Sequence, residues 1–399
     1  MQSKFQTLDS FLNQHQVYWR SEPFHLCQQD ELPWRDHNEA LFIWLQALNE
    51  QQIQAYKEQP ESLVKELNAF FPDLNSIVEA IELPTLSHKG LDLPKGTDTG
   101  IPGRKLEQIM SMSEAVLHHH SGSEWLEWCS GKGFLGRILS QQSQQKVTSF
   151  EWQQSLCDSG QAIANAQMLP MHFVQGDAFS AESDAVFNPH QHAVALHACG
   201  DLHVTLLNKA VSHELPAVTI SPCCYHLIQS EQYQAMSQAA KSSELKLSKS
   251  DLRIPLQETV TGGERVKRHR ELEMSFRLGF SQLVKRELGL IEYQPVPSIK
   301  KSELSEGFES FCWWAADKKS LILSDQVDFD FYERLGAQLF WNMERLSLVQ
   351  QVFRRPLEMW LALDRALYLE EQGYQTSIEQ FCERHITPRN ILIRGRKPD

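Results

Sequence analysis

The spacing of apolar residues changes along the chain and predicts two helical regions around a sheet. From residue 1 to about residue 90, apolar residues recur three or four positions apart, which predicts amphipathic helices. Over residues 124–227, short apolar or β-branched runs alternate with helical patterns, which predicts βαβ units and a parallel sheet. After about residue 258 the helical spacing returns, and Pro356 is expected to interrupt it.

These changes divide the chain into four expected parts. They are a helical N-terminal region over 1–95, an α/β core over 96–255, a helical insertion or subdomain over 256–385, and a last strand of the core sheet over 386–399. The last part contains the compact run "NILIRG". If that run joins the core sheet, the helices before it are an insertion; otherwise they form an independent helical domain.

Composition narrows the class of protein. The formal net charge of −13 argues against a general affinity for nucleic acids, although a local basic surface can still bind RNA. No run of about 18 apolar residues is present, so we expect no membrane span. The first residues lack the layout of a signal peptide, and the eight cysteines include the adjacent pair Cys223 and Cys224. We therefore expect reduced thiols and a cytoplasmic protein.

The stretch "EWLEWCSGKGFLGR" reads as a ligand-binding turn between a strand and a helix. Glu127 lies near the end of the apolar run, and Gly131 and Gly133 follow it. Glycines after a first strand let the backbone approach a ligand closely, but Cys129 stands where dinucleotide turns place their first glycine. The alternative is a tight turn without a ligand.

Acidic residues follow the next two predicted strands and favour a ligand that contains a nucleoside. Glu151 ends the second strand, where a carboxylate can accept hydrogen bonds from ribose hydroxyls. Asp177 follows the third strand, within reach of an adenine amino group. S-adenosylmethionine has no phosphate and tolerates the missing glycine better than a dinucleotide does, so we favour it over a dinucleotide cofactor.

Two further motifs follow the fourth and fifth predicted strands, "LHACGDLH" and "SPCCYHL". The carboxyl ends of parallel strands meet at one edge of the sheet, so we expect both motifs at one mouth. Zinc is one alternative, but these cysteines and histidines lie closer in sequence than usual zinc-ligand pairs, and we predict no metal. Simple burial of the cysteines is another. The candidate catalytic residues, with the first two as proton acceptors or orienting groups, are Asp201, His226, Cys223, Cys224 and Tyr225.

The motifs "WCSGKGFLGR", "LHACGDL", "SPCCYH" and the C-terminal "RPLEMWLALDRALYLEEQGY…ITPRNILI" resemble a branch of the class I S-adenosylmethionine-dependent methyltransferases. The branch contains methyltransferase-like proteins and, more distantly, tRNA 2′-O-methyltransferases with a CGD…CC-H pattern. The resemblance covers about residues 100–228 and 354–397. It implies an α/β, Rossmann-like, doubly wound sheet closed by an antiparallel last strand, with S-adenosylmethionine as cofactor.

The family's first motif reads D-x-G-S-G-K-G, which this chain matches from Ser130 to Gly133 and departs from at Cys129. The preceding "GRKLEQI" resembles the family's basic segment and adds Lys105 to the site. The expected cofactor-binding residues are Lys105, Glu127, Cys129, Ser130, Gly131, Lys132, Gly133, Glu151, Trp152, Asp177, Ala178 and His197.

The resemblance also suggests RNA as the methyl acceptor. Basic residues within 265–286 and 389–397 would contact phosphates, although charge runs on helices are often solvated faces with ion pairs along them. We therefore expect an RNA methyltransferase. The alternatives are a methyltransferase that acts on protein or on a small molecule, and a non-catalytic binding module with the same fold.

Overall fold

The computed structural model describes residues 1–29, 31–94, 96–98, 100–101, 103–257 and 263–398, and it forms two compact units. Unit 1 contains Met1–Gln14, Ser76–Glu258 and Arg354–Asp399, and unit 2 contains His15–Asn75 and Thr259–Phe353. Each unit is therefore assembled from separated stretches of chain, whereas the sequence suggests four consecutive parts. Residues 95, 99 and 102 of the expected loop before the core lie outside the described residues.

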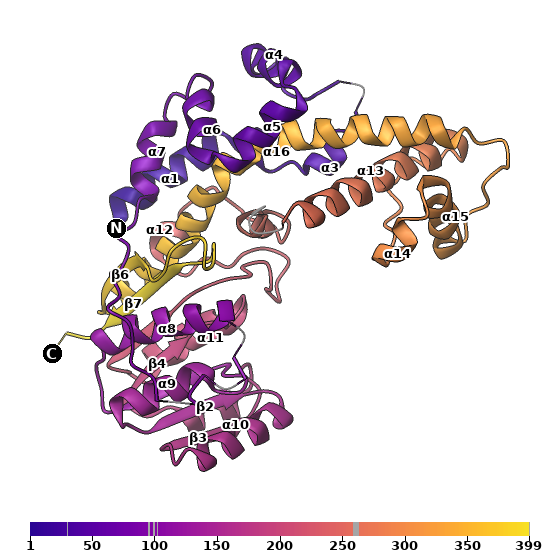
Figure 1. Cartoon of the computed structure of the whole chain (residues 1–399). Helices are drawn as coiled ribbons and strands as arrows, with labels where there is room; N and C mark the ends of the chain where they lie inside the picture. The colour runs from indigo at the N-terminus through magenta and orange to yellow at the C-terminus, as the bar shows by residue number, and fades with distance from the viewer. Residues whose placement is uncertain (30, 95, 99, 102, 258–262, 399) are drawn as a thin grey trace. The chain divides into compact units, whose positions relative to one another are not determined.

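Unit 1 contains one seven-stranded sheet in the order β3-β2-β1-β4-β5-β7-β6 (Figure 1). Strands β1 to β5 pair in parallel, and β7 runs antiparallel between β5 and β6. This order, with a single reversed strand, is that of class I methyltransferases and confirms the expected α/β fold. The strands are β1 (Glu124–Trp128), β2 (Val147–Glu151), β3 (Met171–Gln175), β4 (Gln191–Ala195), β5 (Ala217–Ile220), β6 (Gln375–Gln380) and β7 (Ile391–Arg396).

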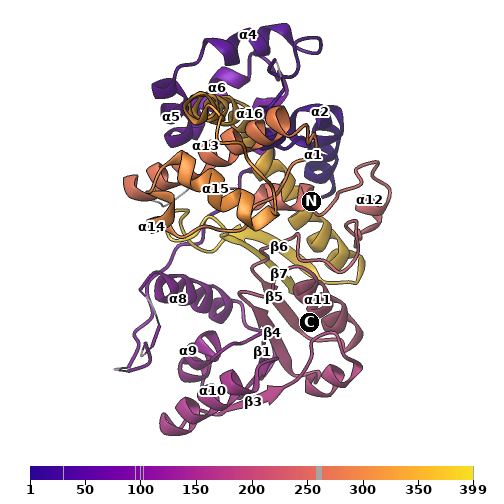
Figure 2. The same cartoon turned by 90° about the vertical axis from the view of Figure 1, so that its right-hand side faces the viewer.

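Helices cover both faces of this sheet, which explains why its central strands β2, β1, β4 and β5 are buried almost throughout. Helices α8 (Gly103–His118), α9 (Phe134–Ser143) and α10 (Gln154–Ala166) lie on one face, and α11 (Asp201–Ser212) lies on the other (Figure 2). Side chains of β1 point alternately to the two faces of the sheet. Trp125 joins the core under α8 and α9, whereas the Trp128 indole donates to the Leu202 carbonyl of α11 at 3.0 Å.

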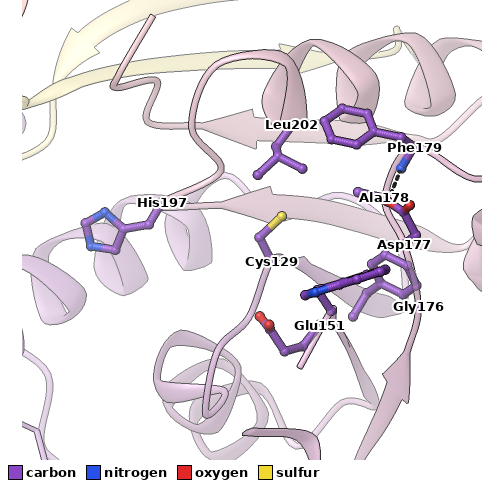
Figure 3. Close-up of a pocket in the computed structure, with 10 residues that line it drawn as sticks. Cys129, Glu151, Gly176, Asp177, Ala178, Phe179, His197 and Leu202 are labelled. Atoms are coloured by element: carbon purple, nitrogen blue, oxygen red, sulfur yellow. Dashed lines mark hydrogen bonds between the residues drawn. The ribbon is translucent and has the colours of Figure 1, made fainter. Parts of the chain in front are cut away.

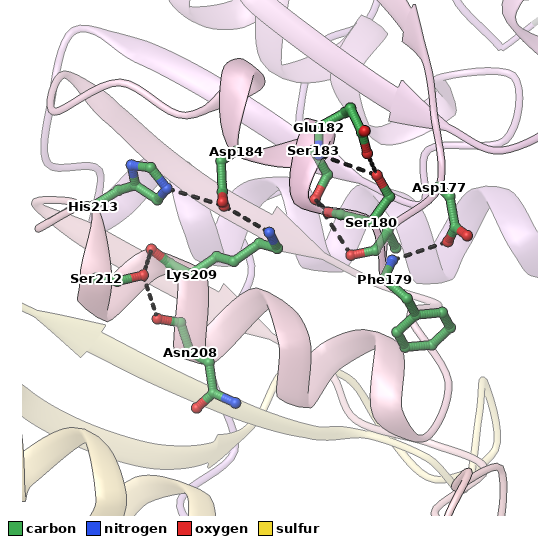
Figure 4. A network of polar contacts seen from close by, with 11 residues as sticks. Asp177, Phe179, Ser180, Glu182, Ser183, Asp184, Asn208, Lys209, Ser212 and His213 are labelled. Atoms are coloured by element: carbon green, nitrogen blue, oxygen red, sulfur yellow. Dashed lines mark hydrogen bonds and ion pairs between the residues drawn. The ribbon is translucent and has the colours of Figure 1, made fainter.

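An ion-pair network fastens the loop after β3 to α11. The short helix η1 (Ala181–Val186) places the Asp184 carboxylate 2.6 Å from the Lys209 ammonium and 3.2 Å from the His213 ring (Figure 4). The hydroxyl of Ser183 in η1 donates to the carbonyl of Ser180, the residue before η1, at 2.8 Å. The chain between β3 and β4 is thereby held against the helix that follows β4.

Unit 1 also contains helices from both ends of the chain. The Asp364 carboxylate of α16 (Phe329–Glu371) accepts hydrogen bonds from the backbone N–H groups of Met236 and Ser237. Asp9 in α1 (Gln2–Gln14) accepts from the Trp360 indole at 2.8 Å. The shorter elements of this unit are α12 (Gln238–Lys241) and η2 (Asp251–Leu256), and α7 (Leu74–Ile81) crosses its boundary with unit 2.

Unit 2 is helical and has its own core. Phe276, Phe280 and Phe311 lie at the centre of that core. The buried Glu344 carboxylate pairs with the Lys57 ammonium and, at 2.9 Å, with the Arg270 guanidinium. Besides the first part of α16, its helices are α2 (Gln16–Trp19), α3 (Pro23–Leu26), α4 (Glu39–Ala47), α5 (Glu50–Glu58), α6 (Pro60–Leu67), α13 (Glu264–Glu287), α14 (Lys301–Leu304) and α15 (Phe308–Lys319).

The expected interruption at Pro356 is wrong, because α16 runs through it as one helix of 43 residues. Proline there removes one backbone hydrogen bond, which costs about 3 kcal/mol or more. The residues that follow include the fully buried Leu357, Trp360 and Leu361. Burial of each such side chain contributes about 1.5–3 kcal/mol, and together these contributions outweigh the cost of the proline.

No described helix, α16 included, has a stretch apolar enough to cross a bilayer.

Candidate active site

A cavity of about 510 Å³ opens at the carboxyl ends of the parallel strands of unit 1. In Figure 3 the sulfur of Cys129 points toward Leu202, and Glu151 lies below it. The volume falls within the usual range for small-molecule sites. The cavity is lined by Cys129, Phe150, Glu151, Trp152, Gly176, Asp177, Ala178, Phe179, His197 and Leu202.

The turn after β1 has the left-handed backbone that its glycines predict. Gly131 has a φ of 59° and Gly133 a φ of 68°, and Cys129 adopts a φ of 56° although its side chain makes that conformation costly. The Ser130 N–H donates to the Phe150 carbonyl at 3.0 Å, which holds the turn against β2. Cys129 therefore occupies a glycine conformation at the wall of the cavity.

Glu151 is fixed at the cavity wall by two backbone donors. Its carboxylate accepts hydrogen bonds from the Gly131 N–H and the Gln153 N–H, both at 2.9 Å. The first bond joins the end of β2 to the turn after β1. The carboxylate is therefore oriented before any ligand arrives.

The remaining acidic and aromatic residues of the prediction also lie at this cavity. Trp152 follows Glu151 and is 62% exposed, although it is a large aromatic side chain. The Asp177 carboxylate accepts a hydrogen bond from the Phe179 N–H at 2.9 Å, which orders the loop after β3. Ala178 lies between them in the wall. An exposed indole beside two carboxylates provides a stacking surface and hydrogen-bond acceptors for a nucleoside.

Glu127 lies away from the cavity and is only 4% exposed. Its carboxylate accepts from the Ser149 hydroxyl at 2.8 Å and from backbone N–H groups of Leu135 and Gly136. Burial raises the pKa of Glu127 to about 7, against the opposing effect of these bonds and of the nearby Arg137. Its position is that of an anchor for the start of α9.

The other expected cofactor residues lie beside the cavity. The turn residues Ser130, Gly131, Lys132 and Gly133 are outside its lining, and the Lys105 ammonium lies 5.2 Å from the centre of the Phe134 ring. His197 lines the cavity, and burial lowers its pKa to about 4, helped by the positive charges of Lys105 and Arg389. Its imidazole is therefore neutral at neutral pH.

Hydrogen bonds join the two cysteine-containing loops at the ends of β4 and β5. The Gly200 N–H donates to the Cys223 carbonyl at 3.3 Å, and the Asp201 N–H donates to the Leu227 carbonyl at 3.0 Å. In return, the Asp201 carboxylate accepts from the Gln229 N–H at 2.7 Å. The structure thus brings both motifs together, and Asp201 joins them through its backbone N–H and its carboxylate.

The candidate catalytic residues lie on these loops, outside the lining of the cavity. Cys223 is buried, with its sulfur 3.2 Å from that of Cys199. Tyr225 is buried under the Arg365 guanidinium, and its hydroxyl has no partner among the described residues. His226 is half-buried with an unpartnered Nδ1, and burial lowers its pKa, followed by the charge of Arg253.

Sequence reasoning missed several residues of the site. Phe150, Gly176 and Leu202 line the cavity through positions that carry no chemical signature. Phe179 offers one weak signal, an exposed aromatic residue just after Asp177. Arg389 reaches the mouth because β7 is antiparallel, so its start lies beside the end of β5. Only the sheet order reveals that placement.

Residues 104–231 match the family model of a methyltransferase domain. The chain therefore contains a methyltransferase domain. The matched residues contain the five parallel strands β1 to β5 and every residue that lines the cavity, so the domain and the candidate site coincide. None of the curated protein sequences matches the chain.

The solved structures that are similar to this chain are distant from it. A tRNA (uracil-54, C5)-methyltransferase from Pyrococcus abyssi shares 16% identity over 29% of this chain and 28% of that enzyme, with a TM-score of 0.25. A putative caffeoyl-CoA O-methyltransferase from Staphylococcus aureus shares 9% identity over 86% of this chain and 99% of that chain, with a TM-score of 0.31. A magnesium protoporphyrin IX methyltransferase from Synechocystis shares 8% identity over 85% of this chain and 100% of that chain, with a TM-score of 0.32. The assignment rests on the domain match and the strand order.

Proposed function

We propose that the cavity binds S-adenosylmethionine and that the chain methylates RNA. The observation that carries the proposal is the Glu151 carboxylate, held by two backbone N–H groups at the end of β2 and facing the cavity. A fixed acceptor at this place in a doubly wound sheet suits ribose hydroxyls. Gly176 adds to the fit, because a Cβ there would lie 2.7 Å from the Phe150 ring and crowd the wall.

We assign each part of the cofactor to residues that line the cavity or lie beside it. Glu151 would accept from the ribose, Asp177 from the adenine amino group, and Trp152 and Ala178 would contact the adenine ring. Lys105 and the backbone of Ser130–Gly133 would hold the methionine part. S-adenosylmethionine would supply an electrophilic methyl group on its sulfonium sulfur. Because methyl transfer is a direct displacement, the protein contributes mainly by positioning the two reactants.

We propose that His226 takes up the proton that the methyl-accepting group loses. Its Nδ1 has no hydrogen-bond partner among the described residues, and its lowered pKa keeps the ring neutral at neutral pH. Asp201, which we also expected in this role, already accepts from the Gln229 N–H and would position the loop. A neutral imidazole can accept the proton that a hydroxyl or an amine loses on methylation.

Cations at the mouth support an anionic acceptor such as RNA. Lys105 and Arg389 act electrostatically on His197, and Arg253 acts on His226, within a chain whose net charge is −13. Local positive charge in an acidic protein steers anionic ligands to that place. RNA phosphates fit this pattern better than a neutral metabolite does.

Part of the expected basic surface is already neutralised. Lys267 pairs with Glu58 and Glu264, Arg277 with Glu273, and Arg394 with Glu379. For RNA contacts within 265–286 and 389–397 we therefore propose exposed cations of α13 and the half-buried Arg389. They are Arg265, Arg268, Lys285, Arg286 and Arg389.

The test is transfer of a labelled methyl group into a lysate from cells that lack the protein. We expect label that nuclease removes and protease does not. Glu151→Ala should reduce incorporation, whereas Glu182→Ala, which alters an exposed carboxylate outside the cavity, should not. Label that resists nuclease would overturn the RNA proposal and indicate protein or a small molecule.

We also propose a cytoplasmic location. All eight cysteines are free thiols in the structure, although Cys199 and Cys223 lie close together. Thiols that stay reduced are typical of the cytoplasm.

A further inference from the structure

Three cysteine sulfurs meet where β4 and β5 end. The sulfurs of Cys199, Cys223 and Cys224 all lie within 4.8 Å of one another, and those of Cys199 and Cys223 are 3.2 Å apart. Cys223 is 6% exposed, and the other two are half-buried. The cluster is adjacent to the cavity, since Cys199 follows two residues after His197 in its wall.

The backbone is arranged to bring these sulfurs together. Gly200 approaches the second loop so closely that a Cβ would overlap the Leu227 carbonyl oxygen, and its N–H donates to the Cys223 carbonyl. Neighbouring residues in an extended chain point to opposite sides. Cys224 instead has a φ of 45°, a left-handed conformation that is costly for cysteine. That turn lets adjacent cysteines face the same partner.

We propose that Cys199, Cys223 and Cys224 bind one zinc ion as thiolates. Thiolate sulfur is the preferred ligand of Zn²⁺ at about 2.3 Å, and a tetrahedral ion at that distance holds its sulfurs roughly 3.8 Å apart. The Cys199–Cys223 separation of 3.2 Å is below this value and no sulfur pair is more than 4.8 Å apart, so movements of about an ångström or less complete the geometry. No fourth His, Cys, Asp or Glu of the described residues joins the group, which leaves one position for water or an exchangeable ligand.

One cation, Arg389, favours thiolates in the cluster. Three thiolates and Zn²⁺ carry a net charge of −1, and Arg389 lies within electrostatic range of Cys199 and Cys224. The Arg389 Nε has no hydrogen-bond partner among the described residues. The positive charge of the half-buried Arg389 side chain would balance the negative charge of the complex. A disulfide between Cys199 and Cys223 is the competing use of two of the sulfurs, but it leaves the strained turn at Cys224 without a purpose.

Metal content of the full chain tests the site independently of S-adenosylmethionine binding. The protein is purified without a metal-affinity tag, in a phosphine reductant, and its zinc is measured by elemental mass spectrometry. We expect roughly one zinc ion per chain in the wild type and in the control Cys312→Ala, which alters a buried cysteine of unit 2. Cys199→Ser and Cys224→Ser, at half-buried positions, should lose at least tenfold in zinc affinity.

Cobalt substitution provides a second readout that does not depend on a variant folding. Wild-type protein stripped of metal and titrated with Co²⁺ should develop the near-ultraviolet charge-transfer absorption of cobalt–thiolate bonds. Cys199→Ser should weaken that absorption and Cys312→Ala should not. Zinc no higher than in Cys199→Ser, together with no cobalt–thiolate absorption, would overturn the proposal. Recovery of a Cys199–Cys223 disulfide from the metal-free protein would then assign the pair to redox chemistry.

Discussion

At the scale of single residues, Cys129 shows how a motif can keep its geometry while its sequence departs from the family pattern. The position needs a left-handed backbone, and Cys129 supplies it with a φ of 56°. Glycine adopts that conformation at low cost, whereas a side chain there costs about 1 kcal/mol. The sequence showed the missing glycine, and the structure shows that the turn forms without it.

Cys129→Gly should therefore preserve or tighten S-adenosylmethionine binding. The substitution relieves the backbone and enlarges the cavity beside Leu202, so we expect the dissociation constant to stay the same or fall by up to about fivefold. Isothermal titration of both proteins measures it. A marked loss of affinity would mean that the thiol itself contacts the ligand.

Glu127 should make the stability of unit 1 depend on pH. Its pKa of about 7 in the folded state lies above the ordinary value of 4.5, so the folded state keeps a proton that the unfolded state releases. Stability from this group is full below about pH 4.5 and is lost as the pH rises to about 7, up to roughly 3 kcal/mol in all.

Glu127→Gln should remove this dependence, because glutamine does not titrate. Urea unfolding followed by hydrogen exchange at β1 and β2 reports the stability of this unit between pH 4.5 and 8. The variant should gain stability relative to the wild type as the pH rises. A difference that stays constant across the range, or that matches Glu182→Gln, would contradict the assignment.

At the scale of elements, much of the sheet could be predicted from sequence. Strands β1 to β5 and β7 are short runs that contain apolar, aromatic or β-branched residues between turn residues, and each forms where the pattern indicates. β6 was missed because "QTSIEQ" is mostly polar and buries only Ile378 well; its pairing with β7 supplies the stability that its composition lacks. α16 continues through Pro356 for a similar reason, since tertiary burial outweighs local preference.

The connection between the loops after β4 and β5 depends on Gly200. Its φ of 56° and ψ of −127° belong to a region that suits only glycine, and a Cβ would strike the Leu227 carbonyl. We expect Gly200→Ala to destabilise unit 1 by about 2–4 kcal/mol. Gly373→Ala is the matched control, since Gly373 has a φ of 83° with open space around it and should cost about 1 kcal/mol. Equal losses in urea unfolding would show that the close approach is unimportant.

At the scale of the whole molecule, the site depends on contacts that no local pattern contains. The sequence identified Glu151, Asp177, Trp152, Ala178, Cys129 and His197, and all of them line the cavity. It could not place Arg389 at the mouth, because that depends on the antiparallel pairing of β7 with β5. The sequence also could not show that the Glu127 carboxylate is buried and accepts hydrogen bonds from the start of α9, away from the cavity wall.

The central claim is that the cavity at the ends of β1 to β4 binds S-adenosylmethionine through Glu151. Calorimetric titration of the full chain with S-adenosylmethionine tests it most directly, with Glu151→Ala and the control Glu182→Ala alongside. We predict saturable binding in the wild type and the control, and a loss of about tenfold to a hundredfold in Glu151→Ala, the worth of charge-assisted hydrogen bonds. No binding in the wild type at millimolar ligand, or equal affinity in Glu151→Ala, would contradict the account.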